Sequence, residues 1–225
     1  MSLFERILKD IKENKKVLKM DESPVYVPND WENGKIAFEK DIRYELYLKK
    51  GYEEYFRIDN FKIKNNNYVI VFLYNKEIEE INVGVLFEDK EGIERIHFIG
   101  YVSLIRNKSV EQIKKEYKPL YQVSKIYIEK DYRGFGLGKL LYSSILEILK
   151  FNIMSDGVQF DGPKHIYSKF SHFEEIHCDI VDIENKIILK EDYKIYHNPK
   201  EFWDFDMDVW SYDYDKYNTR IVLYT

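Results

Sequence analysis

The sequence has one cysteine, no long apolar run and no excess of positive charge. Cys178 stands alone, which excludes an intramolecular disulfide and a cysteine-based zinc site and fits a reducing cytoplasm. No apolar run approaches the length of about 20 residues that a membrane-spanning helix needs. The stretch from Leu3 to Leu18 is broken by charges, unlike a secretory signal peptide. We therefore expect a cytoplasmic protein that does not associate with membranes.

The net charge of −5 disfavours nucleic-acid binding, which usually needs a basic face, although a local basic patch stays open. Hydrophobic residues make up 44% and charged residues 33%, as in soluble globular proteins. Near the C-terminus aspartates alternate with aromatic residues, at Asp204, Asp206, Asp208, Asp213 and Asp215. They form either a surface for a cationic substrate or a solvated acidic edge. They lack the glycine and glutamate of an EF-hand, so we expect no metal.

The first half of the chain is predicted to hold one helix and many strands. Ser2 and Glu5 have the spacing of a capping box before an apolar stripe, so a helix is predicted to begin at Ser2. Runs of β-branched and aromatic residues predict strands at 36–38, 44–48, 55–58, 61–63, 68–74, 81–87 and 93–105. We expect residues 1–60 to form an N-terminal helix and extension and residues 61–225 the main domain, within one compact unit.

In the second half helices alternate with strands. Ser109 and Gln112 predict a short capped helix, and apolar residues at helical spacing predict a helix over 137–149. Asn198 and Pro199 are typical first residues of another helix. Further elements are predicted as strands at 123–128, 151–154 and 220–224, a helix at 162–170, and a hairpin of 176–183 with 186–189. The fold class expected from this pattern is α+β.

Three alternating glycines, Gly134, Gly136 and Gly138, lie where the strand at 123–128 turns into a helix. Without side chains, the backbone N–H groups of such a turn can approach a ligand closely. The helix N-terminus adds a positive dipole end, which favours phosphate or pyrophosphate. Arg133 and Lys139 bring positive side chains to the same place. The pattern fails as a Walker A loop and as a dinucleotide-binding fingerprint, because it lacks their remaining residues.

The segment from Arg133 to Gly138 resembles the acetyl-CoA loop of the GNAT superfamily of N-acetyltransferases, whose signature is Gln/Arg-x-x-Gly-x-Gly/Ala. The resemblance covers roughly residues 68–190, and Lys130 departs from the proline that many relatives carry. It implies a mixed, mostly antiparallel central sheet flanked by helices. It also implies that the strand before the loop splays from its neighbour, with acyl-CoA between the two. The residues that would contact acyl-CoA are Ile126, Ile128, Arg133, Gly134, Phe135, Gly136, Leu137, Gly138 and Lys139.

A second part of the resemblance lies after the helix. Tyr167 falls where relatives carry a tyrosine near the CoA sulfur, and Lys169 matches a frequent lysine. The resemblance implies that Tyr167 protonates the leaving thiolate, whereas a core or surface tyrosine is the alternative. Ser155 and Asp156 followed by Gln159 are similar to GNAT-like proteins of bacteriophages.

The implied reaction is direct attack of an amine on the thioester carbonyl, with a backbone N–H near Ile128 stabilising the oxyanion. Glu129, Asp156 and His97 are candidate general bases, and each is alternatively a structural or solvated group. Cys178 is disfavoured as a nucleophile because it lies in an apolar strand. The acceptor amine, small molecule or protein, stays open. A non-catalytic module that binds acyl-CoA or another protein is an alternative function that also stays open. A homodimer, which family members often form, stays open as well.

Overall fold

The computed structural model describes residues 1–12, 44–63, 66–87, 98–156, 161–195 and 218–225. The helices are α1 (Leu3–Lys12), α2 (Tyr44–Lys49), α3 (Leu137–Ser143) and α4 (Asp161–Ser171). Short turns are η2 (Val110–Gln112), η3 (Lys115–Tyr117) and η4 (Lys130–Tyr132), and η5 (Ser144–Ile148) is a π-helical stretch. The strands are β1 (Glu53–Ile63), β2 (Asn66–Asn75), β3 (Glu80–Phe87), β4 (Phe98–Arg106), β5 (Leu120–Ile128), β6 (Asn152–Met154), β7 (His177–Asp182), β8 (Ile187–Lys190) and β9 (Thr219–Tyr224).

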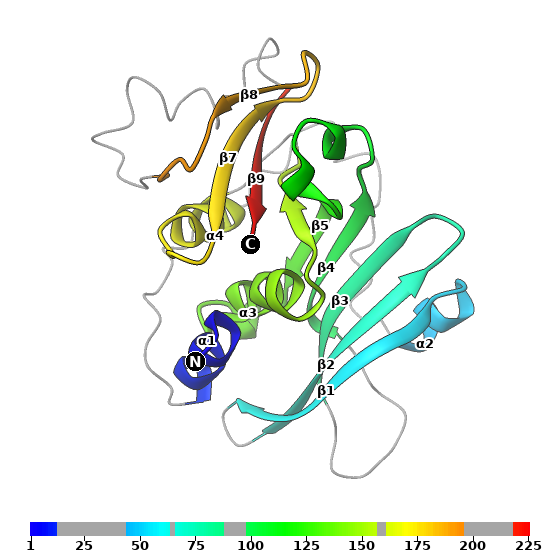
Figure 1. Ribbon diagram of the computed structural model, residues 1–225. Coiled ribbons are helices and arrows are strands. Elements are labelled where there is room, and N and C mark those ends of the chain that lie inside the picture. The colour runs from blue at the N-terminus through cyan, green and yellow to red at the C-terminus, as the bar shows by residue number, and fades with distance from the viewer. Residues whose placement is uncertain (13–43, 64–65, 88–97, 157–160, 196–217) are drawn as a thin grey trace, which may run out of the picture.

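The strands form one sheet in the order β1-β2-β3-β4-β5-β6-β9-β7-β8 (Figure 1). Neighbours in the described sheet are antiparallel, except for β5 and β6, which are parallel. The predicted α+β class, with a mixed and mostly antiparallel sheet, is confirmed. In the described part of the chain, no helix is both long and apolar enough to cross a membrane.

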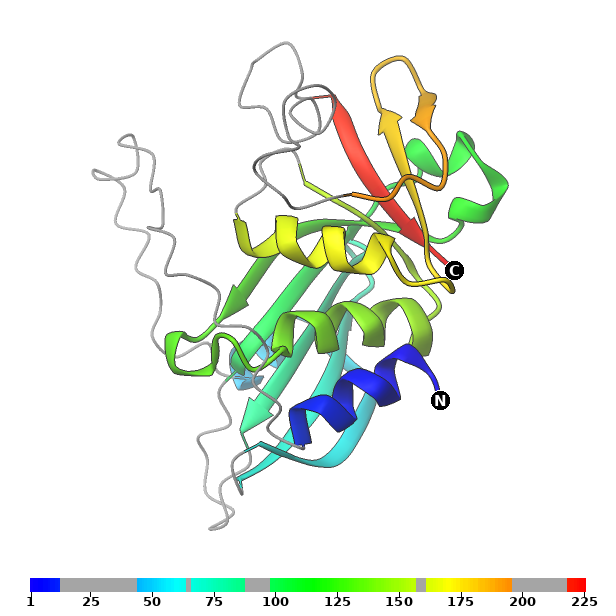
Figure 2. The ribbon, with the colours of Figure 1, turned by 90° about the vertical axis from the view of Figure 1, so that its left-hand side faces the viewer.

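Helices α1, α3 and α4 lie next to one another across one face of the sheet (Figure 2). They bury a shared core against the strands, and its helical members are Leu3, Phe4, Ile7, Leu137, Leu140, Leu141, Tyr142, Ile145, Leu146, Ile166, Tyr167 and Phe170. A smaller cluster lies on the opposite face, where Tyr47 of α2 packs beside Tyr52 and Phe98. Because α1 belongs to the main core, residues 1–12 are an integral part of this domain.

The predicted capping box at the start of α1 is confirmed. Ser2 N–H donates to Glu5 Oε2 at 2.8 Å, and Glu5 N–H donates to Ser2 Oγ at 3.1 Å. The next two amides, of Leu3 and Phe4, donate to the carboxylate of Glu147 at 2.8 and 2.5 Å. Glu147 lies in η5, so one side chain satisfies orphan amides of α1 and ties this helix to its neighbour.

The predicted helix over 137–149 is present but changes character midway. Its N-terminal part is α3, and its apolar stripe is buried as expected. The hydroxyls of Ser143 and Ser144 donate back to the carbonyls of Leu140 and Leu141 at 3.0 and 2.7 Å. Such bonds compete with the backbone ladder, and the helix widens into η5 where they occur.

One predicted strand is wrong: residues 44–48 belong to the helix α2. This helix ends in a Schellman motif, because Tyr52 N–H donates to Tyr47 O at 3.1 Å and Gly51 N–H to Leu48 O at 3.1 Å. Gly51 has φ +82°, the left-handed conformation that such a motif requires. The aromatic run that predicted a strand is instead explained by the packing of Tyr47 on Tyr52 and Phe98.

Two further predictions need correction. Ser109 makes no side-chain cap of η2, because Asn107 Oδ1 accepts the Val110 amide instead, at 3.1 Å. The strands predicted at 55–58 and 61–63 form the single strand β1, with irregular register between Ile58 and Phe61. The strand at 220–224, the helix at 162–170 and the hairpin of 176–183 with 186–189 are confirmed as β9, α4, β7 and β8. The predicted strand at 36–38 and the helix at Asn198 lie outside the described residues.

Candidate functional site

The parallel strands β5 and β6 pair over three residues, which is the whole length of β6. They pair only where Leu120, Tyr121 and Gln122 lie opposite Asn152, Ile153 and Met154. β6 ends at Met154, whereas β5 continues to Ile128 in register with β4. Among the described residues, the second half of β5, which includes Ile126 and Ile128, therefore pairs with β4 on one edge and with no strand on the other. Such an edge can bind an extended ligand through its backbone.

The glycine-rich segment follows directly from this edge. After η4, Gly134 has φ +80° and Gly136 has φ +82°, both in the left-handed region that disfavours residues with a side chain. Gly136 is the N-cap residue of α3, and its carbonyl accepts the Leu140 amide at 3.0 Å. A Cβ at Gly134 would meet nothing within 4 Å, so the space above this residue is open. The amides of the first helical turn need acceptors from outside the helix.

Gly138 has a different role from the two glycines before it. A Cβ there would lie 2.8 Å from Ile166 Cδ1 of α4 and 4.0 Å from Ile126 Cδ1 of β5. The absence of a side chain at Gly138 thus lets α3, α4 and β5 meet. Leu137 is buried beside it, and Phe135 packs partly buried against the core.

Arg133 lies on the surface at the start of the segment. Its Nε donates to the carbonyl of Ile128 at 3.0 Å, which ties the loop to the end of β5. This contact takes one of the five donors of a guanidinium. Lys139 is half-buried in the first turn of α3. The two predicted cations therefore flank the left-handed glycines, one on each side in the chain.

Tyr167 of α4 is fully buried, and it faces a second buried tyrosine, Tyr142 of α3. Their hydroxyl oxygens are 3.4 Å apart and their rings meet edge to face, with centroids 5.6 Å apart. Burial raises the pKa of both phenols above the ordinary value of 10.0. Both hydroxyls are therefore protonated at neutral pH, and each is a weaker acid than a phenol in water. Tyr142 could not be predicted as a site residue from the sequence, because a tyrosine next to a helix's apolar stripe has no signal of its own.

Asp156 follows β6 and acts on the same tyrosine pair. After the larger effect of burial, its negative charge further raises the pKa of Tyr142 and of Tyr167. Arg220 of β9 is also buried, which lowers its pKa, and Asp156 opposes this shift. The structure thus brings together two predicted site residues, Asp156 and Tyr167, and adds Tyr142 and Arg220 to them.

Glu129 lies with the loop, at the end of β5. Its backbone N–H donates to Ile99 O at 2.8 Å. Burial raises the pKa of the nearby Tyr132 phenol, and the charges of Tyr68 and Glu129 add to this effect. Cys178 is buried in β7, which raises the pKa of its thiol and agrees with the expectation that it is not a nucleophile. His97 and the aspartates between 204 and 215 lie outside the described residues.

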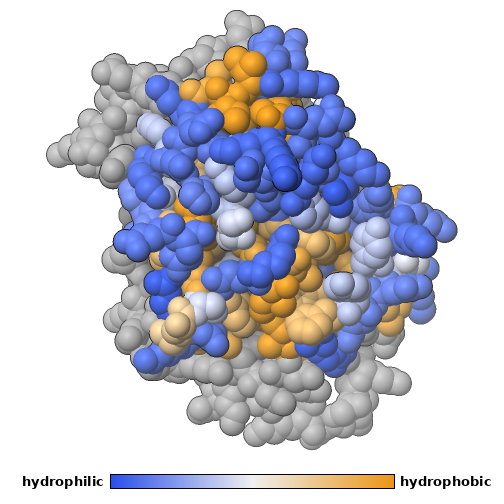
Figure 3. Space-filling model, in the orientation of Figure 1, coloured by the Kyte–Doolittle hydropathy of each residue, from blue (hydrophilic) through white to orange (hydrophobic). Residues whose placement is uncertain are grey.

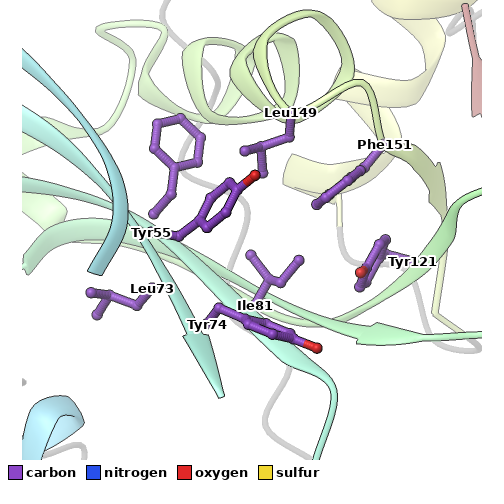
Figure 4. A pocket seen from close by; sticks show the side chains of 8 residues that line it. Tyr55, Leu73, Tyr74, Ile81, Tyr121, Leu149 and Phe151 are labelled. Carbon is purple, nitrogen blue, oxygen red and sulfur yellow. The ribbon is translucent and has the colours of Figure 1, made fainter. Parts of the chain in front are cut away.

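A separate pocket of about 180 Å³ lies at the other end of the helical segment, near Leu149 (Figure 4). It is lined by side chains of β1, β2, β3 and the start of β5, together with Phe151. The glycine segment lies at the beginning of α3, so this pocket belongs to a different region of the molecule.

Comparisons of the chain with protein-family models, with curated proteins and with solved structures gave no match. Among the described residues, no group of three or more His, Cys, Asp or Glu side chains is placed to hold a metal ion.

Proposed function

We propose that this chain is an acyl-CoA-dependent N-acyltransferase of the GNAT type, which transfers an acetyl group to an amine. The observation that carries the proposal is the continuity of the parted strand with the left-handed glycine loop. In the described part of the chain, β5 pairs with β6 as far as Gln122, continues to Ile128 with β4 alone and leads through η4 into Gly134 and Gly136. The resemblance of the sequence motif implies an acyl-CoA bound between such a strand and its neighbour, and this order of elements supports the proposal.

The loop suits a pyrophosphate for three physical reasons. A left-handed Gly136 followed by helical Leu137 turns successive N–H groups toward one side, as in backbone anion sites. The start of α3 contributes the positive end of its dipole. The space above Gly134 is open, so a phosphate can approach the backbone. In this proposal Arg133, Lys139 and the loop amides hold the pyrophosphate, and the pantetheine arm lies along Ile126 and Ile128.

The chemistry proposed for the buried tyrosines is proton donation. The acceptor nitrogen attacks the thioester carbonyl carbon, the C–S bond breaks, and the leaving sulfur takes a proton from Tyr167. Tyr142 shares a hydrogen bond with Tyr167 and can pass a proton on to it. Asp156 lies close enough to influence both phenols, and we propose it as the base that removes the proton of the acceptor amine.

The burial of Tyr167 favours a second candidate function, a non-catalytic acyl-CoA-binding module. Tyr167 is 0% exposed, so its hydroxyl reaches a bound thioester only if α3 and α4 separate slightly. A module that binds acyl-CoA without turnover needs no such movement. Release of free thiol in the presence of an amine distinguishes the two functions, because only the enzyme produces it.

Isothermal titration with acetyl-CoA and with free CoA tests the proposal. We expect saturable binding that Arg133→Glu weakens by at least tenfold, since the substitution reverses a charge beside the pyrophosphate. Lys130→Glu is the matched control, because Lys130 is an equally exposed cation in η4, three residues earlier. Absence of binding to the unsubstituted protein, or equal loss in both variants, would contradict the proposal.

A further inference from the structure

The pocket near Leu149 is apolar and unusually aromatic. Five of its described lining residues are aromatic, namely Tyr55, Phe72, Tyr74, Tyr121 and Phe151. The remaining three are Leu73, Ile81 and Leu149. Apolar residues also gather on the molecular surface between α3 and the strands β1 to β3 (Figure 3). No charged side chain is among the described lining, so the pocket offers nothing to attract an ion.

A β-bulge places Tyr55 over this pocket. Glu54 pairs with Leu73 and Phe56 pairs with Phe72, so Tyr55 is an extra residue on β1. A bulge lets two consecutive side chains point to one face, which a regular strand does not allow. Phe56 packs on Phe72 with ring centroids 5.5 Å apart, and Tyr55 reaches across with its hydroxyl beside Leu149 (Figure 4). The ring of Tyr55 is 72% exposed and forms the rim.

The opposite wall is held in place by its own contacts. Tyr121 and Phe151 stack with centroids 4.7 Å apart and ring planes inclined by 26°. The guanidinium of Arg106 lies 5.3 Å from the centroid of Tyr121, and its Nε donates to Glu111 Oε1. Lys150 has φ +57°, and this strained turn lets Leu149 and Phe151 both line the pocket. These contacts fix the position of the wall without a ligand.

We infer that this pocket binds a small neutral aromatic molecule of one or two rings. A dry apolar cavity of about 150 Å³ holds benzene, so a pocket of about 180 Å³ fits a ring system up to the size of indole. The stacked wall offers a π face, against which a further ring packs favourably at 4.5 to 7 Å. The hydroxyls of Tyr55 and Tyr74 point to different sides of the pocket, and each can bond a polar substituent. The helical segment between the glycine loop and this pocket is roughly 18 Å long, so the two sites are separate. Binding to the pocket therefore does not rest on the proposed function.

Ligand-observed NMR tests the inference with indole and 4-methylphenol as probes and cyclohexanol as the non-aromatic comparison. We expect saturable binding of the aromatic probes, weakened about three- to tenfold in Tyr55→Ala, where one ring contact is lost. Ile78→Ala is the matched control, because Ile78 is 54% exposed but lies outside the pocket. It should leave binding unchanged.

A second variant, Leu149→Phe, adds bulk inside the pocket and should also reduce indole binding. Three results would overturn the inference. The first is no saturable binding of either aromatic probe by the unsubstituted protein, and the second is equal binding of cyclohexanol. The third is tighter binding of N-acetyltryptophanamide than of indole, which would assign the pocket to a polypeptide side chain.

Discussion

Tyr142 and Tyr167 are a pair of phenols that the protein removes entirely from water. Because burial disfavours the phenolate, each hydroxyl holds its proton well beyond neutral pH. In the proposed mechanism the phenol of Tyr167 gives its proton to the leaving thiolate, and its raised pKa favours the return of the proton. Tyr167 is also part of the hydrophobic core, in the same cluster as Phe170 and Ile166.

At this scale we predict the effect of Tyr167→Phe on thiol release. The substitution keeps the ring in the core and removes only the donor, so kcat should fall by roughly 100-fold with little change in the affinity for acetyl-CoA. Tyr142→Phe, which removes only the hydrogen-bonding partner, is the control and should reduce kcat less. An unchanged kcat in Tyr167→Phe would remove this residue from the mechanism.

The three glycines of the loop act as parts of one element but for different reasons. Gly134 and Gly136 adopt left-handed backbone angles, whereas Gly138 keeps α3 close to α4. The two roles can be tested separately, because only the packing role of Gly138 depends on a neighbouring side chain, that of Ile166.

We predict that Gly138→Ala and Ile166→Val are energetically coupled. A Cβ at position 138 collides with Ile166 Cδ1, and valine lacks that atom, so Gly138→Ala should be more favourable by about 1 kcal/mol in the Ile166→Val background. Gly136→Ala should destabilise by about 1–2 kcal/mol through its backbone angle, in either background. Free energies of unfolding in urea, measured for the two single variants and the double variant, give a double-mutant cycle. If the effects of Gly138→Ala and Ile166→Val simply add, Gly138 is not needed for the close packing of α3 on α4.

The anchoring of α1 by Glu147 leads to another prediction. Glu147→Ala leaves the amides of Leu3 and Phe4 without this acceptor, so the free energy of unfolding should fall by about 1–2 kcal/mol. Glu174→Ala, at an exposed position beyond α4, is the matched control. Urea denaturation measures both variants, and equal losses would mean that the carboxylate does not hold α1.

The elements found from the sequence are those with a strong local pattern. The apolar stripe of α3, the capping box at Ser2 and the alternating glycines are each contained in a few consecutive residues. α2 was missed because its six residues are fixed by the packing of Tyr47 and by the turn at Gly51. The aromatic pocket could not be predicted, since Tyr55, Tyr121 and Phe151 meet only after the sheet has formed.

Across the whole molecule, tyrosines repeatedly occupy buried positions. Burial, followed by the charge of Glu80, raises the pKa of Tyr52 to about 12. Burial is also the main cause of the raised pKa values of Tyr117, Tyr142 and Tyr167, on other elements of the fold. In the unfolded chain these phenols lose their protons near pH 10, whereas in the folded chain they keep them.

The folded protein should therefore lose stability as pH rises above about 10. Above that pH the unfolded state binds fewer protons than the native state, so each such tyrosine lowers the unfolding free energy by about 1.4 kcal/mol per pH unit. Below about pH 10 these tyrosines are protonated in both states, so they do not make the unfolding free energy depend on pH. Thermal melts between pH 7 and 11 measure the slope. Tyr142→Phe should reduce it, with exposed Tyr55→Phe as control, and a flat profile would contradict the burial described here.

We propose that the glycine loop and the second half of β5 together form one acyl-CoA site. Amide NMR shifts of the isotope-labelled protein during titration with free CoA test this proposal. We expect the largest shifts from Gly134 to Gly138 and from Ile126 to Ile128. Shifts confined to other regions, such as Tyr55 and Phe151, or no shifts at millimolar CoA, would contradict the claim.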